Sequence, residues 1–545
     1  MGEQCEVLPD ECWELIFKLV EHHRFASLSL VCKRFLSLTN RLVVRLLISD
    51  STLVLLPQLF RRFPRLRTID LSEFHGDVDA LLSLIAKSGL DLQSLCVSNQ
   101  KSLPIDGLRV LGSKMKNLRC LNCSKNGTLQ DRDLGLIAQL FPHLEELDIS
   151  YPEHGYGYSS NGLPDWSSSS RPISDAGIYS LSEKLKGLRK INLSGNYFIT
   201  DKSLDYLSMN CVLLSEFFIH YCGFITQNGI ALVLRRCANL NSLSISGIGL
   251  PFVNLKACLP LNKLILAHCR NFTFNGISAL LCKHQSLQYL DLEAANFLTD
   301  ECMCELSKFL RSLTYLNLSM CNGVTNSSFF NLTINCPFLN EVKMVGTSLG
   351  AKDFTTGLVA NSRVKSLNLA QNSSLCNDTI KRVAFICPNL SLLDVSNCVN
   401  ITEEGVLKVL QRCSQIRYLG INHCSGIKTL SIDFELSKLE ELCVRGLNID
   451  DNGLATIGNR CQRLLQLDLA ECFNVTAKGV KEVVRKCGLL REISLKWCNN
   501  VNVDVVAWMV FSRPSLRRIV PPPGFIPTES RRNLFLRHGC LICEG

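Results

Sequence analysis

Cysteine is the residue that offers the most chemistry in this chain, because 28 of its 545 residues are cysteines. The pairs Cys120–Cys123 and Cys540–Cys543 have the Cys-x-x-Cys spacing found in zinc sites and in thiol–disulfide centres. A structural zinc ion needs four converging ligands, and each of these pairs stands alone. We therefore expect neither pair to hold a metal, and we predict no cofactor.

Signatures of other catalytic centres are incomplete. The segment Gly107–Lys114 has the glycines of a phosphate-binding loop but lacks the terminal Gly-Lys-Ser/Thr order. No His-Glu-x-x-His or Gly-x-Ser-x-Gly motif occurs. Histidine precedes cysteine at His268–Cys269 and His423–Cys424, but a nucleophilic thiol needs exposure and a lowered pKa, and both cysteines hold positions that predict burial. We predict that the protein is not an enzyme.

A repeated pattern, Leu-x-x-Leu-x-Leu, explains where these residues lie. It occurs eighteen times, and most steps between successive units are 25 or 26 residues. The first apolar residues are Leu66, Leu92, Leu118, Leu144, Leu188, Leu214, Leu240, Leu261, Leu287, Leu313, Leu339, Val364, Leu390, Ile416, Leu439, Leu464, Leu490 and Leu516.

Each unit contains one strand and one helix. In the segment 287–292, Leu290 and Leu292 alternate with polar neighbours, so they share the buried face of a strand. The second half of the unit starts with a residue suited to cap a helix. Such residues are Ser174, Thr226, Thr273, Thr402, Asp450 and Thr476. Stacked units bury the apolar face that one unit cannot bury alone, which predicts an α/β solenoid with its strands on the concave side.

Fifteen cysteines occupy two fixed positions of the repeat. Seven follow the first apolar residue of a unit by eight residues, and eight precede it by three. They are Cys222, Cys269, Cys321, Cys398, Cys424, Cys472 and Cys498, and then Cys211, Cys237, Cys258, Cys336, Cys387, Cys413, Cys461 and Cys487. We expect buried free thiols that fill the core, and hence a reducing compartment, the cytoplasm and/or the nucleus.

The repeats resemble the leucine-rich-repeat family in its cysteine-containing subtype. The resemblance covers residues 50–520 and implies a curved solenoid of about 18 strand–helix repeats. One step is 18 residues too long, which predicts a loop insertion at 151–172 that is rich in Gly, Ser and Tyr. Residues 521–545 begin with a triple proline that ends the last strand, and we expect them to form a C-terminal cap or tail.

Residues 6–46 precede the repeats and predict three short helices, the first with Asp10 as its N-cap, the second over 25–30 and the third over 31–38. Leu8-Pro9, then Ile16-Phe17, then Val31-Cys-Lys-Arg34 resemble an F-box, although Phe35 stands where that family usually has Trp. The resemblance implies binding to a Skp-family adaptor and through it a cullin. It places at the adaptor, or in the packing behind it, Leu8, Pro9, Leu15, Ile16, Val31, Cys32 and Phe35. The alternative is a helical cap over the first repeat.

The outward positions of the strands are candidates for binding a protein substrate, because exposed aromatic residues anchor interfaces. Those on or beside the strands are Phe218, His220, Tyr221, Tyr289, Tyr315, Tyr418 and Trp497, and those in the insertion are Tyr156, Tyr158 and Trp166. The alternatives are that the strand aromatics fill gaps between neighbouring repeats and that the insertion is a tolerated loop.

Charge argues against two other classes of partner. The formal net charge is +9 without a basic cluster, so we expect no nucleic acid. Plant hormone receptors of the F-box/leucine-rich-repeat kind hold an inositol phosphate on a basic floor. Here the basic residues expected on the concave face are dispersed among acids, so we expect no such ligand. They are Lys190, Lys263, Lys343, Arg445 and Lys496. The N-terminus lacks a secretory signal, and no apolar run of about 18 residues predicts a membrane span.

Together these features predict a non-catalytic, substrate-recruiting subunit of an SCF-type ubiquitin ligase that promotes ubiquitin-dependent degradation of a protein substrate. Two alternatives remain open. One is a leucine-rich-repeat binding scaffold without ligase association. The other is a small-molecule receptor of the F-box/repeat kind, which requires a pocket near residues 151–172.

Overall fold

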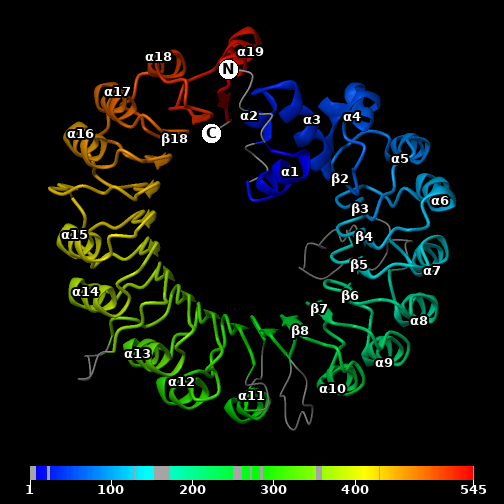
Figure 1. Ribbon diagram of the computed structural model, residues 1–545. Helices are drawn as coiled ribbons and strands as arrows, with labels where there is room; N and C mark the ends of the chain where they lie inside the picture. The colour runs from blue at the N-terminus through cyan, green and yellow to red at the C-terminus, as the bar shows by residue number, and fades with distance from the viewer. Residues whose placement is uncertain are drawn as a thin grey trace, which may run out of the picture. The chain divides into compact units, whose positions relative to one another are not determined.

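The computed structural model describes residues 8–20, 25–127, 129–152, 172–249, 261–269, 273–282, 286–351, 359–428 and 430–543. The chain divides into two compact units, one formed by residues 1–250 and 255–260 and the other by residues 251–254 and 261–545. Each unit contains its own run of parallel strands, with a row of helices beside them (Figure 1).

The first unit opens with three helices, α1 (Asp10–Lys18), α2 (Phe25–Ser29) and α3 (Lys33–Leu42). Its strands are β1 (Arg45–Ser49), β2 (Thr68–Glu73), β3 (Ser94–Cys96), β4 (Cys120–Asn122), β5 (Glu146–Asp148), β6 (Lys190–Asn192), β7 (Glu216–His220) and β8 (Ser242–Ser246). Its remaining helices are the 3-10 helix η3 (Asp50–Leu55), α4 (Leu56–Arg62), α5 (Val78–Lys87), α6 (Ile105–Lys114), α7 (Asp131–Leu140), α8 (Asp175–Lys184), α9 (Asp201–Asn210) and α10 (Gln227–Arg236).

The second unit continues the same alternation. Its strands are β9 (Lys263–Ile265), β10 (Tyr289–Asp291), β11 (Tyr315–Asn317), β12 (Glu341–Lys343), β13 (Ser366–Asn368), β14 (Leu392–Asp394), β15 (Tyr418–Gly420), β16 (Glu441–Cys443), β17 (Gln466–Asp468), β18 (Glu492–Ser494), β19 (Arg518–Val520) and β20 (Leu541–Ile542). Its helices are α11 (Phe274–Leu281), α12 (Asp300–Ser307), α13 (Asn326–Asn335), α14 (Asn377–Ile386), α15 (Glu403–Arg412), α16 (Asp451–Arg460), α17 (Ala477–Lys486), α18 (Asp504–Ser512) and α19 (Glu529–Arg537).

The register of the sheet follows the leucine pattern. Within each unit every strand pairs in parallel with the next, and equivalent residues align, as Leu95, Leu121 and Leu147 do along β3, β4 and β5. These leucines are buried between the sheet and the helices, whereas residues on either side of them point to the opposite face of the sheet, here called the strand face. All eighteen predicted units are present as β2 to β19, which confirms the α/β repeat architecture.

Two further strands lie outside the leucine pattern. The strand β1 begins at Arg45, before the predicted start of the repeats at residue 50, and pairs with β2. In the tail, α19 is followed by β20, which pairs with β19. The tail therefore extends the sheet of the second unit by one short strand.

The buried cysteines form a second ladder beside the leucines. Of the fifteen repeat-position cysteines, the fourteen that the structure describes are all buried. The thiol of Cys321, for example, donates to the carbonyl oxygen of Leu292 in the preceding repeat at 3.3 Å. Burial raises the pKa of this thiol to about 12, so it stays protonated.

Helix starts follow the predicted caps with two exceptions. The side chains of five predicted caps accept a backbone N–H of the first turn, and these are Ser174, Thr226, Thr273, Asp450 and Thr476. Thr402 occupies the N-cap of α15, but its hydroxyl accepts a hydrogen bond from Asn377 of the preceding repeat instead of capping the helix. The prediction for Asp10 was wrong, because Pro9 is the N-cap of α1 and Asp10 pairs with arginines.

Candidate functional site

The helices α1, α2 and α3 share a small aromatic core. Phe17 and Phe35 are buried, and their rings meet edge to face with centroids 4.9 Å apart. The ring of Trp13 lies 4.8 Å from that of Phe35. Phe35 therefore packs the helical module from inside, and the backbone N–H of Phe35 donates to the sulfur of Cys32, which caps α3. The helix α3 begins at Lys33, two residues later than predicted.

Apolar side chains remain uncovered on the outside of this module. Leu15 and Val31 are 62% and 60% exposed, and Leu19 and Leu30 are 88% and 86% exposed. Leu8, Pro9 and Ile16 are also exposed. Five of the seven residues predicted to face an adaptor are thus at the surface, while Phe35 is in the core and Cys32 is partly buried. The sequence prediction missed Leu30, which stands beside Val31 at the end of the second helix.

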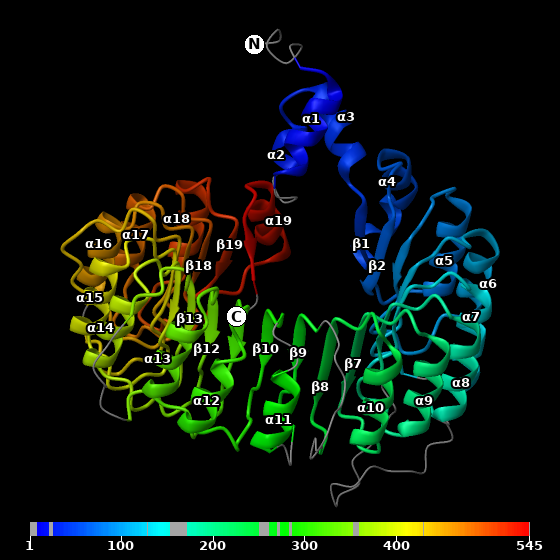
Figure 2. The same ribbon diagram turned by 60° about the horizontal axis from the view of Figure 1, so that its bottom comes forward.

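A chain of ion pairs holds these helices together and ties them to the first repeats. Arg34 and Arg41 of α3 pair with Asp10 at 2.8 Å and 2.6 Å. Arg41 also approaches Glu14 at 3.3 Å, and Glu14 pairs with Arg65, which precedes β2, at 3.4 Å. The helical module thus lies against the start of the sheet, as Figure 2 shows for α3 and β1.

The predicted aromatic anchors lie in different settings. Tyr289 and Tyr315 stack on each other on the strand face, with ring centroids 3.9 Å apart, so each fills the gap beside the other. His220 makes a 2.6 Å hydrogen bond with Ser244 across β7 and β8, and burial lowers the pKa of its imidazole. Tyr418 is partly buried on β15.

Tyr221 and Trp497 lie beyond their strands and are exposed. Tyr156, Tyr158 and Trp166 lie outside the described residues.

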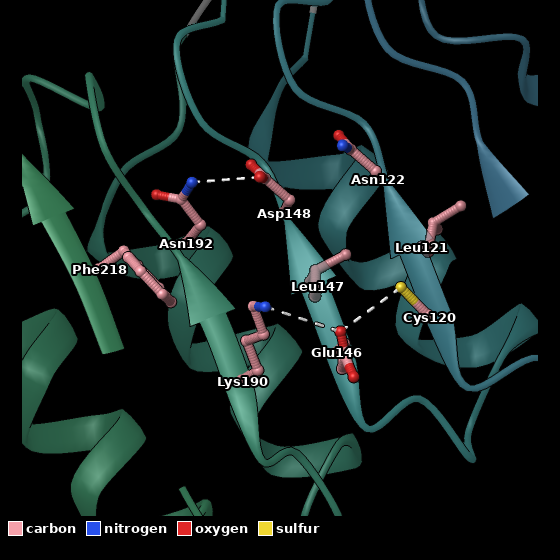
Figure 3. Close-up of a pocket in the computed structure, with 9 residues that line it drawn as sticks. All are labelled: Cys120, Leu121, Asn122, Glu146, Leu147, Asp148, Lys190, Asn192 and Phe218. Carbon is pink, nitrogen blue, oxygen red and sulfur yellow. Dashed lines mark hydrogen bonds and ion pairs between the residues drawn. The ribbon is translucent and has the colours of Figure 1, made fainter. Parts of the chain in front are cut away.

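Phe218 borders a cavity of about 390 Å³ on the strand face of β4, β5, β6 and β7, here called the β4–β7 cavity. Figure 3 shows its side chains, which converge from these four neighbouring strands. The lining residues are Cys120, Leu121, Asn122, Glu146, Leu147, Asp148, Lys190, Asn192 and Phe218. Sequence analysis placed several of them on the strand face but did not predict that they enclose a cavity.

Hydrogen bonds and two ion pairs of Lys190 fix the polar lining of this cavity. The amide of Asn192 donates to Asp148 at 3.1 Å, and the thiol of Cys120 lies 3.7 Å from Glu146 (Figure 3). The ammonium of Lys190 lies 4.0 Å from Glu146 and 3.4 Å from Glu216. Burial raises the pKa of the Cys120 thiol, so this cysteine remains neutral.

The two cysteines of each Cys-x-x-Cys pair have different surroundings. Cys120 lies on the strand face, whereas Cys123 is buried behind the sheet, so the two thiols point to opposite sides. Cys540 is buried, while Cys543 accepts a hydrogen bond from Arg518. Within the described ranges, no three His, Cys, Asp or Glu side chains gather closely enough to hold a metal ion. Among those same residues, no helix has both the length and the apolar character required to cross a membrane.

Comparison with known proteins agrees with this architecture. Residues 6–46 match the F-box domain family. The chain is 26% identical over 176 residues to F-box/LRR-repeat protein 4 of Bos taurus, which covers 30% of this chain and 27% of that protein. It is 29% identical over 141 residues to putative F-box/LRR-repeat protein 23 of Arabidopsis thaliana, covering 23% of this chain and 30% of that protein. The matches therefore span less than a third of either relative.

Solved structures of repeat proteins are more distant. The complex of Rad7 and Elc1 from yeast aligns with a TM-score of 0.47 and 19% identity, over 79% of this chain and 96% of that chain. The functional domain of InlJ from Listeria monocytogenes, which includes a cysteine ladder, aligns with a TM-score of 0.40 and 16% identity, over 69% and 73%.

The chain thus has an N-terminal helical module that matches the F-box, followed by strand–helix repeats in leucine register. In this organisation it is similar to F-box proteins with leucine-rich repeats.

Proposed function

We propose that this protein recruits substrates to an SCF-type ubiquitin ligase. In this proposal α1, α2 and α3 bind a Skp-family adaptor, and through it a cullin, while the strand face binds a protein substrate. The protein itself performs no bond chemistry. Its contribution is to hold a substrate lysine close to the ubiquitin-loaded enzyme, which raises the effective concentration of the two reactants.

The observation that supports this proposal best is the uncovered apolar surface of the F-box helices. Leu15 and Val31 have most of their side-chain surface exposed, although a module of this size has few apolar residues with which to form a core. Exposed apolar surface of this kind marks an interface. A cap over the first repeat would instead bury such side chains against the solenoid.

Co-purification with a Skp-family adaptor tests the proposal. Leu15→Asp with Val31→Asp should abolish the complex and leave the fold intact, because both side chains are at the surface. Ile526→Asp is the matched control, since Ile526 is equally apolar, is exposed and lies in the second unit. A second variant, Leu8→Ala with Pro9→Ala, alters the start of the F-box and should weaken the complex as well. Retention of a stoichiometric complex by Leu15→Asp/Val31→Asp would refute the assigned surface.

The alternative scaffold without ligase association predicts no complex with any Skp-family adaptor from a folded, wild-type chain. The small-molecule alternative has some support from the β4–β7 cavity, because β5 ends at Asp148, shortly before the insertion. It predicts that substrate capture depends on an added ligand.

We also propose a cytoplasmic and/or nuclear location, supported by buried free thiols, which imaging of a fluorescent fusion would test.

A further inference from the structure

The β4–β7 cavity is small among ligand pockets and is large enough to receive one long side chain. Its volume of about 390 Å³ lies at the lower end of the range of about 300–1,000 Å³ that is typical of ligand pockets. It opens on the strand face, where a bound polypeptide would run across the strands. The strand segments at Leu121 and Leu147 form its floor, while the side chains of these two leucines point to the other side of the sheet.

Carboxylates outnumber cations around this cavity. Glu146 and Asp148 lie two residues apart on β5 and therefore point to the same side of the sheet. Glu216 stands on the other side of Lys190, so one ammonium is shared between two glutamates at 4.0 Å and 3.4 Å. The partner of Asp148 across the strands is the neutral amide of Asn192. Three carboxylates thus face one cation, and the cavity has a net negative charge.

Some cations elsewhere on the strand face have one carboxylate partner each. Lys343 pairs with Glu341 at 3.5 Å, and Arg445 pairs with Glu471. Acids with a neutral partner also occur in the second unit, where the amide of Asn317 donates to Asp291 and Glu293.

One aromatic ring borders the carboxylates, because Phe218 forms one wall of the cavity. Tyr151 follows β5 and Tyr221 follows β7, and both are exposed beyond the lining residues. The backbone N–H groups of these tyrosines bond to the carbonyl oxygens of Ser194 and Ser246 of the next repeats. Aromatic faces attract cations, and the planar guanidinium of arginine stacks on them while it forks toward carboxylates.

We propose that the β4–β7 cavity receives an arginine or lysine side chain from a basic segment of the protein substrate. The cationic group pairs with Glu146 and Asp148, and its methylene groups pack on Phe218. Arginine binds more tightly than lysine because of its planar shape. This inference relies on the proposed function only for the identity of the partner as a ligase substrate; recognition of the basic segment itself does not require the adaptor.

The test uses the full chain and four rhodamine-labelled Gly/Ser peptides that carry three Arg, three Lys, three Gln or three Glu residues, with binding measured by fluorescence anisotropy. The variant is Glu146→Gln with Asp148→Asn. Asparagine is compatible with the fold at this position, because Asn122 and Asn192 hold the equivalent places on β4 and β6 and accept the same backbone N–H. The matched control, Glu305→Gln with Asp378→Asn, removes two exposed acids from helices of the second unit.

The expected order of affinity is Arg, then Lys, with the Gln and Glu peptides not binding. The Glu146→Gln/Asp148→Asn variant should weaken the Arg peptide about tenfold or more, because charge-assisted hydrogen bonds are lost, and the control should not. Equal loss in both variants, a preference for the Gln or Glu peptide, or no binding of the Arg peptide would each overturn the inference. Adaptor binding is measured on the same samples, so failure of the cavity and failure of the ligase proposal are distinguished.

Discussion

The phenol ring of Tyr221 lies against Gly247 of the next repeat, so closely that a β-carbon on Gly247 would overlap Cδ1 of the ring. Both residues have positive φ, 54° and 65°, and both stand seven residues after the first leucine of their repeat. The same contact between neighbouring repeats recurs for Tyr151 with Gly195 and for His423 with Gly446. In these three pairs the ring therefore occupies the space that a side chain would need at the glycine of the following repeat.

We expect Gly247→Ala to destabilise the first unit by about 1–3 kcal/mol, because the alanine would have to adopt a left-handed backbone and also displace the tyrosine ring. Urea denaturation followed by circular dichroism measures this loss. Gly89→Ala separates the two causes, since Gly89 has a φ of 73° but no atom within 4 Å of the place that an added methyl group would take. It should cost less than Gly247→Ala, and Tyr221→Ala should relieve part of the cost of Gly247→Ala. A lack of any relief would contradict the steric explanation.

Successive helices are joined at their N-termini by a carboxylate. Asp201, in the first turn of α9, accepts hydrogen bonds from the backbone N–H and the hydroxyl of Thr226 at 2.7 Å and 2.5 Å. Asp201→Ala should lower the free energy of unfolding by about 1–3 kcal/mol, because both donors lose their acceptor. Asp201→Asn should cost less, since Asn377 serves the equivalent position by accepting from Thr402 N–H and donating to its hydroxyl.

Asp106→Ala is the control for that measurement, because Asp106 is also in a first turn but is 85% exposed and approaches only Arg109. Its free energy of unfolding should match that of the wild type within about 0.5 kcal/mol. If Asp201→Ala behaved as Asp106→Ala does, the bridge between repeats would have no part in stability.

Cysteine reactivity should differ sharply along the chain. At Cys376, partial burial raises the pKa, but hydrogen bonds from the Thr379 hydroxyl and from backbone N–H groups at the start of α14 outweigh it, so the pKa lies below its ordinary value. Burial raises the pKa of Cys398 to about 12. Iodoacetamide at pH 8 should therefore label Cys376 first and leave Cys398 unlabelled in the folded protein, as peptide mass spectrometry would reveal. Comparable labelling of both in urea would serve as the control.

Acid should loosen the F-box helices through Asp10. Hydrogen bonds from Arg34 and then Arg41 lower the pKa of Asp10 below its ordinary value of 3.8. A carboxylate with a depressed folded pKa stabilises the fold above its unfolded pKa, and this stabilisation is lost as the pH falls through the folded pKa. Asp10→Asn should therefore speed amide exchange in residues 10–18 at pH 7, and the ratio to wild type should approach one as the pH falls through the folded pKa of Asp10. A ratio independent of pH would contradict this role for the charge.

The repeat register could be predicted from the sequence because the leucines of one unit lie within a few residues of one another and recur at a nearly constant interval. Every first apolar residue from Leu66 to Leu516 precedes a strand, and the cysteine positions follow from the same register. The strand β1 escaped prediction, since Arg45–Ser49 lacks the leucine spacing and is identified only by its pairing with β2. The left-handed position escaped it too, because residues as different as Tyr221, Met320 and Trp497 occupy it.

The candidate site was less accessible to sequence reasoning. Local pattern was enough to indicate that Leu15 and Val31 belong to the F-box, but packing decided that Phe35 is inside and Leu30 outside. The β4–β7 cavity depends on the sizes of residues from four strands that lie far apart in the sequence. The longer side chain of Glu146 and the shorter one of Asn122 shape the cavity only because β4 and β5 are neighbouring strands, and the sequence does not show this directly.

Only Val43 and Val44 separate the end of α3 from the start of β1. With the ion pair between Glu14 and Arg65, this junction leaves the F-box little freedom to swing against the first repeats. If the proposed function holds, the repeat that binds the substrate sets the distance between the substrate and the F-box. A substrate bound one repeat further along the first unit is displaced by about 4.8 Å, the spacing of neighbouring strands. The choice of which substrate lysine receives ubiquitin would then be set by the repeat that holds the substrate, and not by diffusion on a flexible tether.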